Sequence, residues 1–494
     1  MATSSHDTIL NSTISEETWV LQTRQKLKNA TPFDENTPIS VCHVPKFISV
    51  INPQAYAPQV IALGPYHYLR PELCHMDRYK IETIKWYWTS HQIGLVVEKL
   101  QEIGSKVRAC YHKYLDVEDD TLALMLAIDG LFLIYLLSKH LNRFTDDASV
   151  FRDVMMLENQ IPIIVLKEIE NTIGSNDAAL FSMMQVFCES QSPFVLSSDY
   201  QQVLQESEVL HLLDLLHEMI TMHEIIKQPA SAPQEVTEVS RQESLVLKVD
   251  PDKDKLIQDS IDILTSAAAS SIKPIKQLTS LPWRKISNLL SHGSGLKEVA
   301  SKNPLVQEID IPSVSKLSKL AGIKFQPETG GNLQIHLDSP TATLYMPVIT
   351  LNGNSEVILR NLVAYEMASR NSTSGYHNLI LAQYVDLMSG MIDTKEDASL
   401  LQRAGIIKGD LSNSQVADLF NGMNKSSQKV YNETAAKINA YYWQKPKVKV
   451  YRFVKKYVYE SWRVLTVVFT LVLLFLMILQ SVCDVYDCKR VVKW

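Results

Sequence analysis

The sequence is poor in the residues that mark disulfide-rich and metal-binding domains. Only six of its 494 residues are cysteine, and none of them forms a Cys-x-x-Cys pair or another metal-ligand spacing. We therefore expect free thiols in a reducing compartment, with no zinc site and no disulfide scaffold. The first thirty residues lack an apolar stretch, so we expect no cleaved signal peptide.

An excess of positive charge is also missing. The chain has 48 Lys and Arg against 54 Asp and Glu, which gives a net charge of −6. Binding of nucleic acid by the whole molecule is therefore disfavoured, and any basic function must be local.

The common catalytic signatures are absent as well. The sequence has no phosphate-binding glycine loop, no nucleophile elbow and no dinucleotide fingerprint. His217 and His223 resemble part of a zinc-protease helix, but their spacing of six turns them about 240° apart around a helix axis. We expect His211, His217 and His223 to face solvent or to cap the helix.

A calcium-loop resemblance fails for a similar reason. Asp250, Asp252 and Asp254 begin like such a loop, but Lys255 and Ile261 stand where Gly and a bidentate Glu are required. We therefore predict no metal, no cofactor and no enzymatic activity.

The remaining composition predicts a packed, mainly α fold with a small β element (α+β), followed by one C-terminal transmembrane helix. Hydrophobic residues make up 46% and charged residues 21% of the chain. The predicted parts are a variable segment (1–38), an N-terminal helical part (39–226), a partly disordered linker (227–305), a C-terminal α+β part (306–443), a basic-aromatic juxtamembrane segment (444–463), a transmembrane helix (464–483) and a short tail (484–494).

Two apolar patterns predict helices in the N-terminal part. Residues 76–103 repeat apolar side chains every three to five positions. Residues 121–137, TLALMLAIDGLFLIYLL, are more apolar still, but Asp129 and Gly130 interrupt a run that is short for a bilayer. We predict a buried core helix there.

Short strands are expected in the C-terminal part, at residues 322–326, 333–337 and 343–351. Pro347 lacks a backbone N–H and is expected to confine the last strand to an edge or a bulge. Residues 352–354 should form a turn, with Ser355 as the cap of a helix over 357–370.

The most apolar run of the chain, residues 464–483, carries no charge. As a helix it would span about 30 Å, the thickness of a bilayer's hydrocarbon core. Basic residues precede it, interleaved with Tyr, Phe and Trp, and such residues favour the cytoplasmic membrane surface and anionic headgroups. We predict a single-pass anchor that leaves a cytosolic body on the basic side. The basic residues are Lys445, Lys447, Lys449, Arg452, Lys455, Lys456 and Arg463.

Four patterns carry a family resemblance. They are VPKFISVINPQAYAPQVIALGPYHY with LCHMDRYK (44–80), LAIDGLFLIYLL (126–137), LENQIPIIVL (157–166), and IPSVSKLSKLAGIKF continuing through LYMPVI to RNLVAYE (311–366). In order and spacing they resemble the plant-specific family called domain of unknown function 247, over most of residues 40–483. Tyr135 stands where the family usually has an acidic residue.

The resemblance implies a plant membrane-associated protein with one C-terminal hydrophobic helix and no established catalytic activity. Some grass members are associated with self-incompatibility loci. We expect the polar motif residues to determine the fold: His67 as a loop anchor, Asp129 with a donor, and Asn361 and Glu366 holding the second part against the first. The full set is Pro65, His67, Asp129, Glu158, Asn159, Gln160, Asn361 and Glu366.

Three functional hypotheses follow. The favoured one is a C-terminally anchored plant protein whose body binds an unknown protein partner in recognition or signalling. The second is an enzyme with an unfamiliar site formed by His67, Asp129 and Glu158. The third is a lipid-binding module that uses the basic residues before the apolar run.

Overall fold

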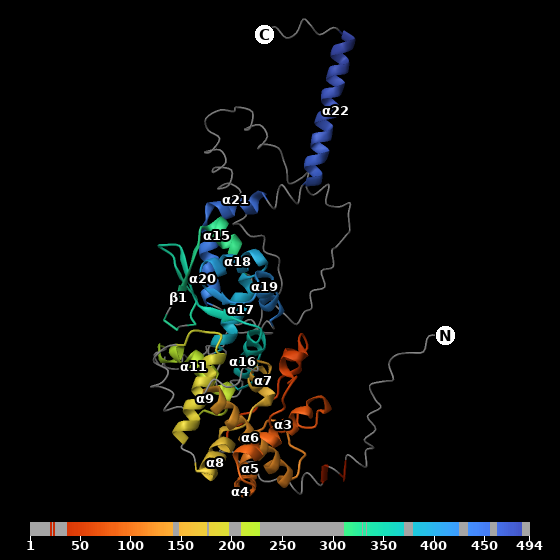
Figure 1. Ribbon diagram of the computed structural model, residues 1–494. Helices are drawn as coiled ribbons and strands as arrows, with labels where there is room; N and C mark the ends of the chain where they lie inside the picture. The colour runs from red at the N-terminus through yellow and green to blue at the C-terminus, as the bar shows by residue number, and fades with distance from the viewer. Residues whose placement is uncertain are drawn as a thin grey trace, which may run out of the picture. The chain divides into compact units, whose positions relative to one another are not determined.

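The computed structural model describes residues 20–21, 23–24, 37–141, 148–174, 177–196, 209–227, 311–328, 330–331, 333–369, 379–423, 433–454 and 462–486 (Figure 1). Helices make up most of these residues and strands are few, which confirms the mainly α fold with a small β element. The predicted linker beyond residue 227, most of the segment 1–38, Lys455 and Lys456 lie outside the described residues.

The chain divides into two compact units. Unit 1 contains residues 1–223 and 351–381, and unit 2 contains residues 224–350 and 382–494. The sequence grouped all of 306–443 together, whereas residues 351–381 join the N-terminal unit. The reason lies in side-chain contacts that no local pattern reveals, and they are described below.

Unit 1 is built on helix α6 (Asp119–Leu141), which packs against α3 (His75–Tyr87), α4 (Ser90–Glu102), α8 (Ile163–Ile173) and α9 (Asp177–Gln191) (Figure 1). Leu131, Phe132 and Leu137 of α6 are fully buried, which confirms the predicted core helix. The other elements of the unit are α2 (Lys46–Ser49), η1 (Pro53–Tyr56), η2 (Pro71–Leu73), α5 (Gly104–Ala109), α7 (Ala148–Val154), η3 (Leu157–Asn159), α11 (Leu212–Lys227) and α16 (Ser355–Ser369).

The apolar pattern of residues 76–103 forms two helices. Trp88 leaves the helical conformation at φ −126° and ψ 144°, and ends α3. Thr89 then starts α4 with a capping box, in which its side chain accepts from the Gln92 N–H while the Gln92 side chain accepts from the Thr89 N–H. The break reorients the chain while keeping both apolar faces against α6.

The strands within the described residues lie in unit 2, except that Leu351, the last residue of one strand, begins the second segment of unit 1. β1 (Lys324–Glu328), β3 (Thr343–Pro347) and β2 (His336–Asp338) form a sheet in the order β1-β3-β2, with β1 parallel and β2 antiparallel to β3. β4 (Ile349–Leu351) pairs with β5 (Ile407–Gly409) in a second sheet. Strands therefore form in all three predicted regions.

The expectation for Pro347 was wrong. β3 is the central strand of its sheet, and Pro347 is its last residue, opposite Glu328. Proline is tolerated there because the ladder ends at that residue, and the chain changes sheet between Pro347 and Ile349.

Among the described residues, the helices of the folded body of unit 2 are α15 (Val314–Ala321), α17 (Ile380–Met391), α18 (Lys395–Arg403), α19 (Asn413–Gly422) and α20 (Glu433–Gln444), with α21 (Pro446–Val454) after them. The helix predicted after the turn 352–354 forms as α16, but Ser355, predicted as its cap, is the first residue of the helix. There the Asn352 side-chain oxygen accepts from the Asn354 N–H at 2.9 Å and from the Ser355 hydroxyl at 3.1 Å.

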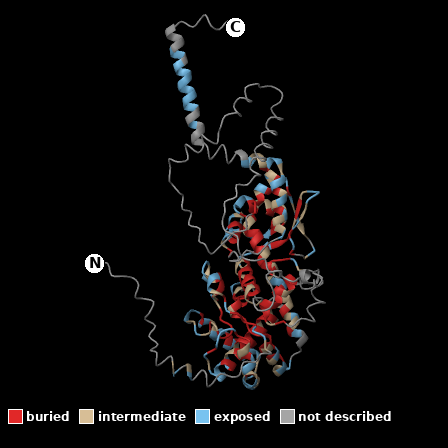
Figure 2. Ribbon diagram, turned by 180° about the vertical axis from the view of Figure 1, so that it is seen from behind, coloured by how far each residue is buried: buried red, intermediate tan, exposed pale blue. Residues whose placement is uncertain are grey.

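The last helix, α22 (Trp462–Tyr486), contains the whole of the predicted span 464–483. Within the described residues, the one helix that suits a bilayer crossing by length and composition is Asp119–His140, but 67% of its most apolar stretch is buried, as expected of a core helix. In α22 the described apolar stretch is the shorter Phe469–Ile478. Its large apolar side chains are exposed (Figure 2). A C-terminal crossing therefore stays a prediction.

Candidate functional site

Residues 57–64 of the first motif form an extended segment in unit 1, which we call the anchored segment. It contains neither helix nor strand, so its backbone N–H and C=O groups need partners from elsewhere. Those partners are side chains of the other motifs, and they converge on this segment.

Asp153 of α7 supplies the densest set of bonds. One of its carboxylate oxygens accepts from the backbone N–H groups of Gln59, Val60 and Ile61, at 2.8, 2.6 and 3.1 Å. The other accepts from the Arg152 guanidinium at 2.9 Å. Asp153 is fully buried, so all of its lone pairs are used within the fold. Sequence reasoning missed this residue, and its only signal was a charge just before the apolar run 154–157.

Asn159 and Gln160 use both ends of their amides. The Asn159 oxygen accepts from the Leu63 N–H at 2.7 Å, and its nitrogen donates to the Ile61 and Asp153 carbonyls. The Gln160 nitrogen donates to two carbonyls of the 154–156 turn, and its oxygen accepts from a backbone N–H of α11. Both amides therefore satisfy backbone groups around η3 and the anchored segment, which agrees with the predicted fold-determining role of the polar motif residues.

Asp129 finds its donor inside the core. One carboxylate oxygen accepts from the Gly64 N–H at 2.8 Å, and the other lies 2.6 Å from the Lys80 ammonium, which also donates to the Ala62 carbonyl. Burial raises the pKa of Asp129, although Lys80 and the Gly64 N–H oppose that rise. The bonds hold the end of the anchored segment against α3 and α6.

Gly64 turns the chain immediately before the buried Pro65. Its φ is +70°, and a Cβ at this position would lie 3.1 Å from the Tyr111 hydroxyl. Both observations favour glycine, and Pro65 then restricts the following backbone. The Gly-Pro-Tyr pattern is thus explained by the geometry of the turn.

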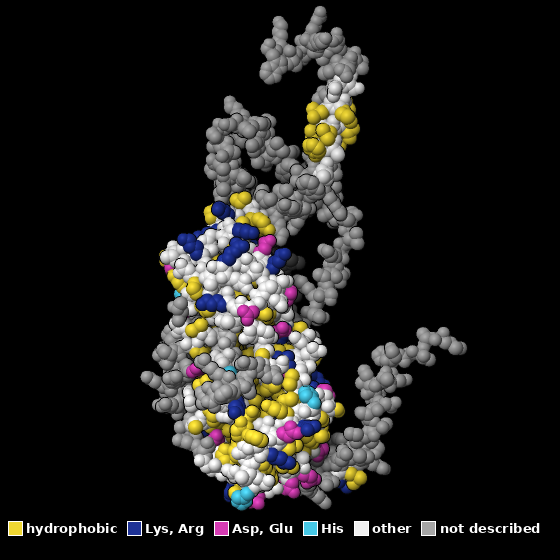
Figure 3. Space-filling model, viewed as in Figure 1, with side chains coloured by type: hydrophobic (Ala, Val, Ile, Leu, Met, Phe, Trp, Pro, Cys, Tyr) yellow, Lys and Arg dark blue, Asp and Glu magenta, His cyan; other side chains and the backbone are white. Residues whose placement is uncertain are grey.

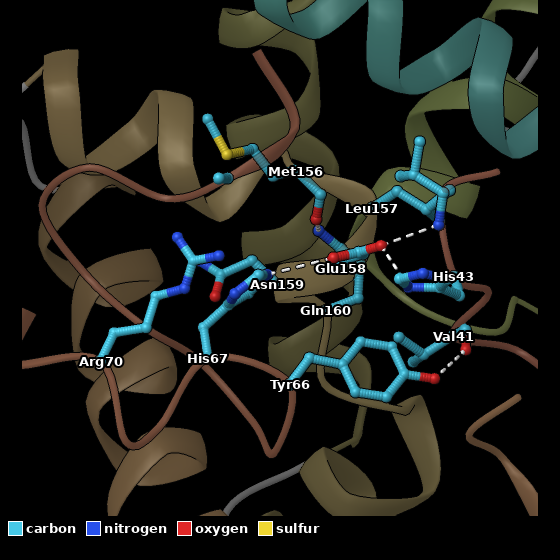
Figure 4. Close-up of polar contacts among 12 residues, drawn as sticks. Val41, His43, Tyr66, His67, Arg70, Met156, Leu157, Glu158, Asn159 and Gln160 are labelled. Carbon is cyan, nitrogen blue, oxygen red and sulfur yellow. Dashed lines mark hydrogen bonds and ion pairs between the residues drawn. The ribbon is translucent and has the colours of Figure 1, made fainter. Parts of the chain in front are cut away.

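Glu158 occupies the rim of this network, between two imidazoles (Figure 4). Its carboxylate lies 2.5 Å from His43 Nδ1 and 3.4 Å from His67 Nε2, and it accepts from the Val44 N–H at 2.8 Å. Burial alone would raise the pKa of Glu158, but the contacts with His67, Val44 and His43 together lower it. Glu158 is therefore a carboxylate at neutral pH.

The two histidines differ in access. The His43 side chain is 50% exposed, whereas the His67 side chain is 5% exposed. Among the residues that the structure describes, His67 Nδ1 has no hydrogen-bond partner. A carboxylate between two imidazoles, one of them half exposed, could move a proton to a group arriving from solvent.

The hypothetical site of His67, Asp129 and Glu158 is thus assembled only in part. His67 and Glu158 lie together, while the oxygens of Asp129 are bonded to Gly64 and Lys80.

A second polar cluster lies between α11 and α16. The Tyr365 hydroxyl donates to Asp214 at 2.6 Å, and the His217 imidazole lies 3.3 Å from Glu366. All four side chains are buried. Burial alone would lower the pKa of His217, but hydrogen bonds and charges from Glu218 and Glu366 raise it to about 9.

His211 is the neutral member of this cluster. Its Nδ1 accepts from the Asp214 N–H at 3.0 Å, so its Nε2 carries the proton that it donates to the Ser40 carbonyl at 2.9 Å. Burial lowers the pKa of His211 to about 3. The expectation of solvent-facing histidines was wrong for His211 and His217, because backbone and carboxylate partners compensate their burial, although His211 does cap α11. His223 has no described side chain.

Two motif residues attach α16 to the rest of unit 1. The Asn361 oxygen accepts from the Leu157 N–H at 2.9 Å, and its nitrogen donates to the Ala55 carbonyl at 2.8 Å. Glu366 lies 3.3 Å from His217 of α11 and also accepts from the Leu381 N–H at 3.1 Å, within the segment 351–381 itself. These bonds explain why residues 351–381 belong to unit 1.

The predicted juxtamembrane residues fall into two groups. Lys445, Lys447, Lys449 and Arg452 lie on or next to α21, which packs against α15 and α20 and buries Val448 completely. Arg463 belongs to α22, but its side chain lies outside the described residues, as do Lys455 and Lys456. The first half of the segment is therefore part of the folded body.

Metal ligands and reactive thiols are two further kinds of candidate group. Within the described ranges, no three His, Cys, Asp or Glu side chains are arranged to hold a metal ion. Cys42, Cys74, Cys110 and Cys188 are free thiols, and burial raises the pKa of Cys42 to about 11, so it is no nucleophile at neutral pH.

Comparison with known proteins identifies the family. Residues 41–476 match domain of unknown function 247, described as a plant protein of unknown function. The chain is 35% identical to "Putative UPF0481 protein At3g02645" of Arabidopsis thaliana over 514 aligned residues, which cover 94% of each chain. It is 24% identical to "UPF0481 protein At3g47200" of the same plant over 191 residues, covering 35% of this chain and 40% of the relative. No solved structure matches. The chain belongs to the plant family of domain of unknown function 247.

Proposed function

We propose that this plant protein is a membrane-tethered, non-catalytic protein whose helical body binds another protein. For this binding we propose a biological role in recognition or signalling. The resemblance to a family with members at self-incompatibility loci implies such a role. One observation carries the proposal. The polar side chains of the motifs form hydrogen bonds with backbone groups of the fold, so few of them are left to act on a substrate.

The anchored segment supports the non-catalytic part of the proposal. Asp153, Asn159 and Asp129 are buried, and each has its oxygens bonded to backbone N–H groups or to a neighbouring cation. A general acid or base must reach a substrate proton directly or through one water molecule. These side chains are committed to holding the chain instead.

The last helix supports the tether. α22 has 25 residues, about 37 Å of helix, which is enough to cross a bilayer. Phe469, Phe475 and Met477 are 60–64% exposed. Exposed apolar side chains on consecutive turns of one helix have no stable place in water, so insertion into lipid is the favoured outcome. The basic residues before α22 favour a cytosolic body.

The first motif supports partner binding. Phe47, Val50 and Ile51 are 58, 74 and 53% exposed, whereas Ile48, which lies between Phe47 and Val50 in the sequence, is 2% exposed and holds this turn against the core. Trp86 on α3 is 84% exposed. Large apolar and aromatic side chains held in place by a rigid segment are typical of protein interfaces, where a few of them provide most of the binding energy.

The tether is tested with the full chain expressed in plant cells. We expect it to remain in the membrane pellet after alkaline carbonate extraction, and Leu474→Asp with Leu476→Asp to release it. A matched pair of exposed changes in unit 1, Val195→Asp with Leu124→Asp, should leave it in the pellet. Release of the unchanged chain by carbonate would contradict the tether.

Partner binding is tested by proximity labelling from the full chain in its native tissue. We expect Phe47→Ser with Val50→Ser to remove one reproducible set of labelled proteins, while the exposed change Leu124→Ser keeps it. An identical labelled set for both variants would show that the first motif binds no partner.

Glu158 with His43 and His67 supports one alternative, an enzyme with an unfamiliar site. In that case Glu158→Gln, which keeps the size of the side chain, would abolish turnover on a substrate panel while the protein stayed folded. Turnover that survives this change, or none in the unchanged protein, favours the non-catalytic proposal.

A further inference from the structure

The folded body of unit 2 gathers basic side chains from two distant parts of the sequence. α15 packs against α20 and α21, so residues near 316 lie beside residues near 449. Figure 3 shows Lys and Arg side chains gathered over α15 and α21. We call this surface the basic face and define it by the basic residues on or next to α15 and α21, which are Lys316, Lys319, Lys445, Lys447, Lys449 and Arg452.

The basic face is positively charged after its ion pairs are counted. Lys316 lies 3.6 Å from Asp393, and Lys319 lies 4.0 Å from Glu396, with all four side chains about half or more exposed. Exposed pairs of this kind are weak and break readily. In the part of the chain that the structure describes, the other four basic residues form no ion pair. Six cations less two carboxylates leave a net charge of four.

Aromatic side chains lie among these charges. Trp443 and Tyr451 are 41 and 44% exposed. The Arg452 guanidinium lies 4.4 Å from the centre of the Trp443 ring, and the Lys445 ammonium lies 3.9 Å from that of Tyr441. Half-exposed Trp and Tyr beside Lys and Arg is the composition of protein surfaces at the headgroup level of a bilayer.

The chain length fixes how far this surface can be from a tethering helix. α21 ends at Val454 and α22 begins at Trp462, so the connection cannot exceed about 29 Å even when fully extended. If α22 lies in a bilayer, this short connection keeps the basic face at a high effective concentration near the lipid headgroups. Weak contacts then suffice to dock the basic face on them.

We propose that the basic face docks unit 2 onto anionic lipid headgroups, so that α22 and the basic face together fix this unit at the membrane. The inference rests on the proposed tether. To the juxtamembrane residues expected from the sequence it adds two more, Lys316 and Lys319. They lie about 130 positions earlier in the sequence, and sequence reasoning did not connect them with a membrane.

The experiment uses the full chain reconstituted into vesicles of phosphatidylcholine, with or without 30% phosphatidylserine. Acylation of individual lysines is followed by mass spectrometry at low salt. We expect Lys319, Lys447 and Lys449 to react at least threefold more slowly in the anionic vesicles, and 0.5 M salt to remove the difference. Lys46 and Lys106, exposed on unit 1, are the internal references and should react equally in both.

Two variants make the result specific. Lys316→Gln with Lys319→Gln removes two charges from the basic face, and should weaken docking about 30-fold and so abolish protection of Lys447 and Lys449. Lys46→Gln with Lys106→Gln removes two charges from unit 1 and should leave the protection intact. Equal reaction rates in both kinds of vesicle would overturn the inference.

The remaining outcomes separate this inference from the tether. If the chain resists carbonate extraction but shows no lipid-dependent protection, the tether is supported and the docking of the basic face is refuted. A chain that carbonate extracts, but that phosphatidylserine still protects, loses the tether and keeps the basic face. Protection by a soluble homopolymeric RNA over neutral vesicles, matching that by phosphatidylserine, would reassign the surface to nucleic acid and overturn the lipid inference.

Discussion

Replacement of Asp153 by alanine tests whether the motif side chains build the fold. The carboxylate is fully buried and accepts three consecutive backbone N–H groups of the anchored segment, those of Gln59, Val60 and Ile61. Alanine removes the acceptor and leaves these donors without a partner. It also removes the anion that faces Arg152.

The magnitude follows from the burial of each donor. Ile61 is fully buried, so water cannot replace the lost acceptor there, and an unsatisfied buried donor costs about 1–3 kcal/mol. Gln59 and Val60 are less buried and lose about 1 kcal/mol each, the usual net value of a hydrogen bond. We expect a total loss of about 3–5 kcal/mol. Asp153→Asn keeps an acceptor oxygen and should lose about half as much.

Hydrogen exchange of the full chain, followed by mass spectrometry, measures this loss locally. A loss of 3 kcal/mol corresponds to about 150-fold faster exchange of the amides at 59–61. Asp410→Ala removes an exposed carboxylate of unit 2 and is the matched control, with no change at 59–61. If Asp153→Ala left the protection of these amides as it was, Asp153 would not hold the segment and the reasoning would be refuted.

Three further changes test other parts of unit 1. Folding raises the pKa of His217 from an ordinary 6.5 to about 9, so unit 1 should keep its full stability below pH 6.5 and lose up to about 3 kcal/mol as the pH rises through 9. Urea titrations at several pH values measure this dependence of stability on pH. His217→Gln should remove most of it. Lys80→Met leaves the Asp129 carboxylate buried without its cation and should destabilise unit 1 by about 3–5 kcal/mol. In a double-mutant cycle, adding Asp129→Asn should recover part of that loss of stability. If the losses of the two single variants simply add, the pairing is disproved. Gly130→Ala places a methyl group against a side chain of α8 and should cost about 1–3 kcal/mol in thermal unfolding, whereas Gly94→Ala, with open space around it, should be neutral or stabilising by up to about 1 kcal/mol.

The sequence by itself determined the local structure. The apolar run 121–137, interrupted by Asp129 and Gly130, predicted a buried helix, and α6 is the core of unit 1. The short apolar runs bounded by Gly, Asn and Pro predicted the strand regions of unit 2, and the turn at 352–354 marked the start of α16. These predictions succeed because periodicity, turn residues and helix caps depend on neighbours within a few positions. The family is readable for the same reason, since its motifs are contiguous stretches.

Only the tertiary structure decided which groups meet. Asp153 binds residues more than ninety positions earlier, Lys80 pairs with Asp129, and Asn361 reaches Leu157 across two hundred residues. The burial of His211 and His217 and the central place of β3 belong to the same class. A buried polar side chain is stable wherever the folded chain brings it a partner, and a linear sequence does not contain that information. For the same reason, only the packing of α15 on α21 revealed that the basic face extends beyond the residues next to α22.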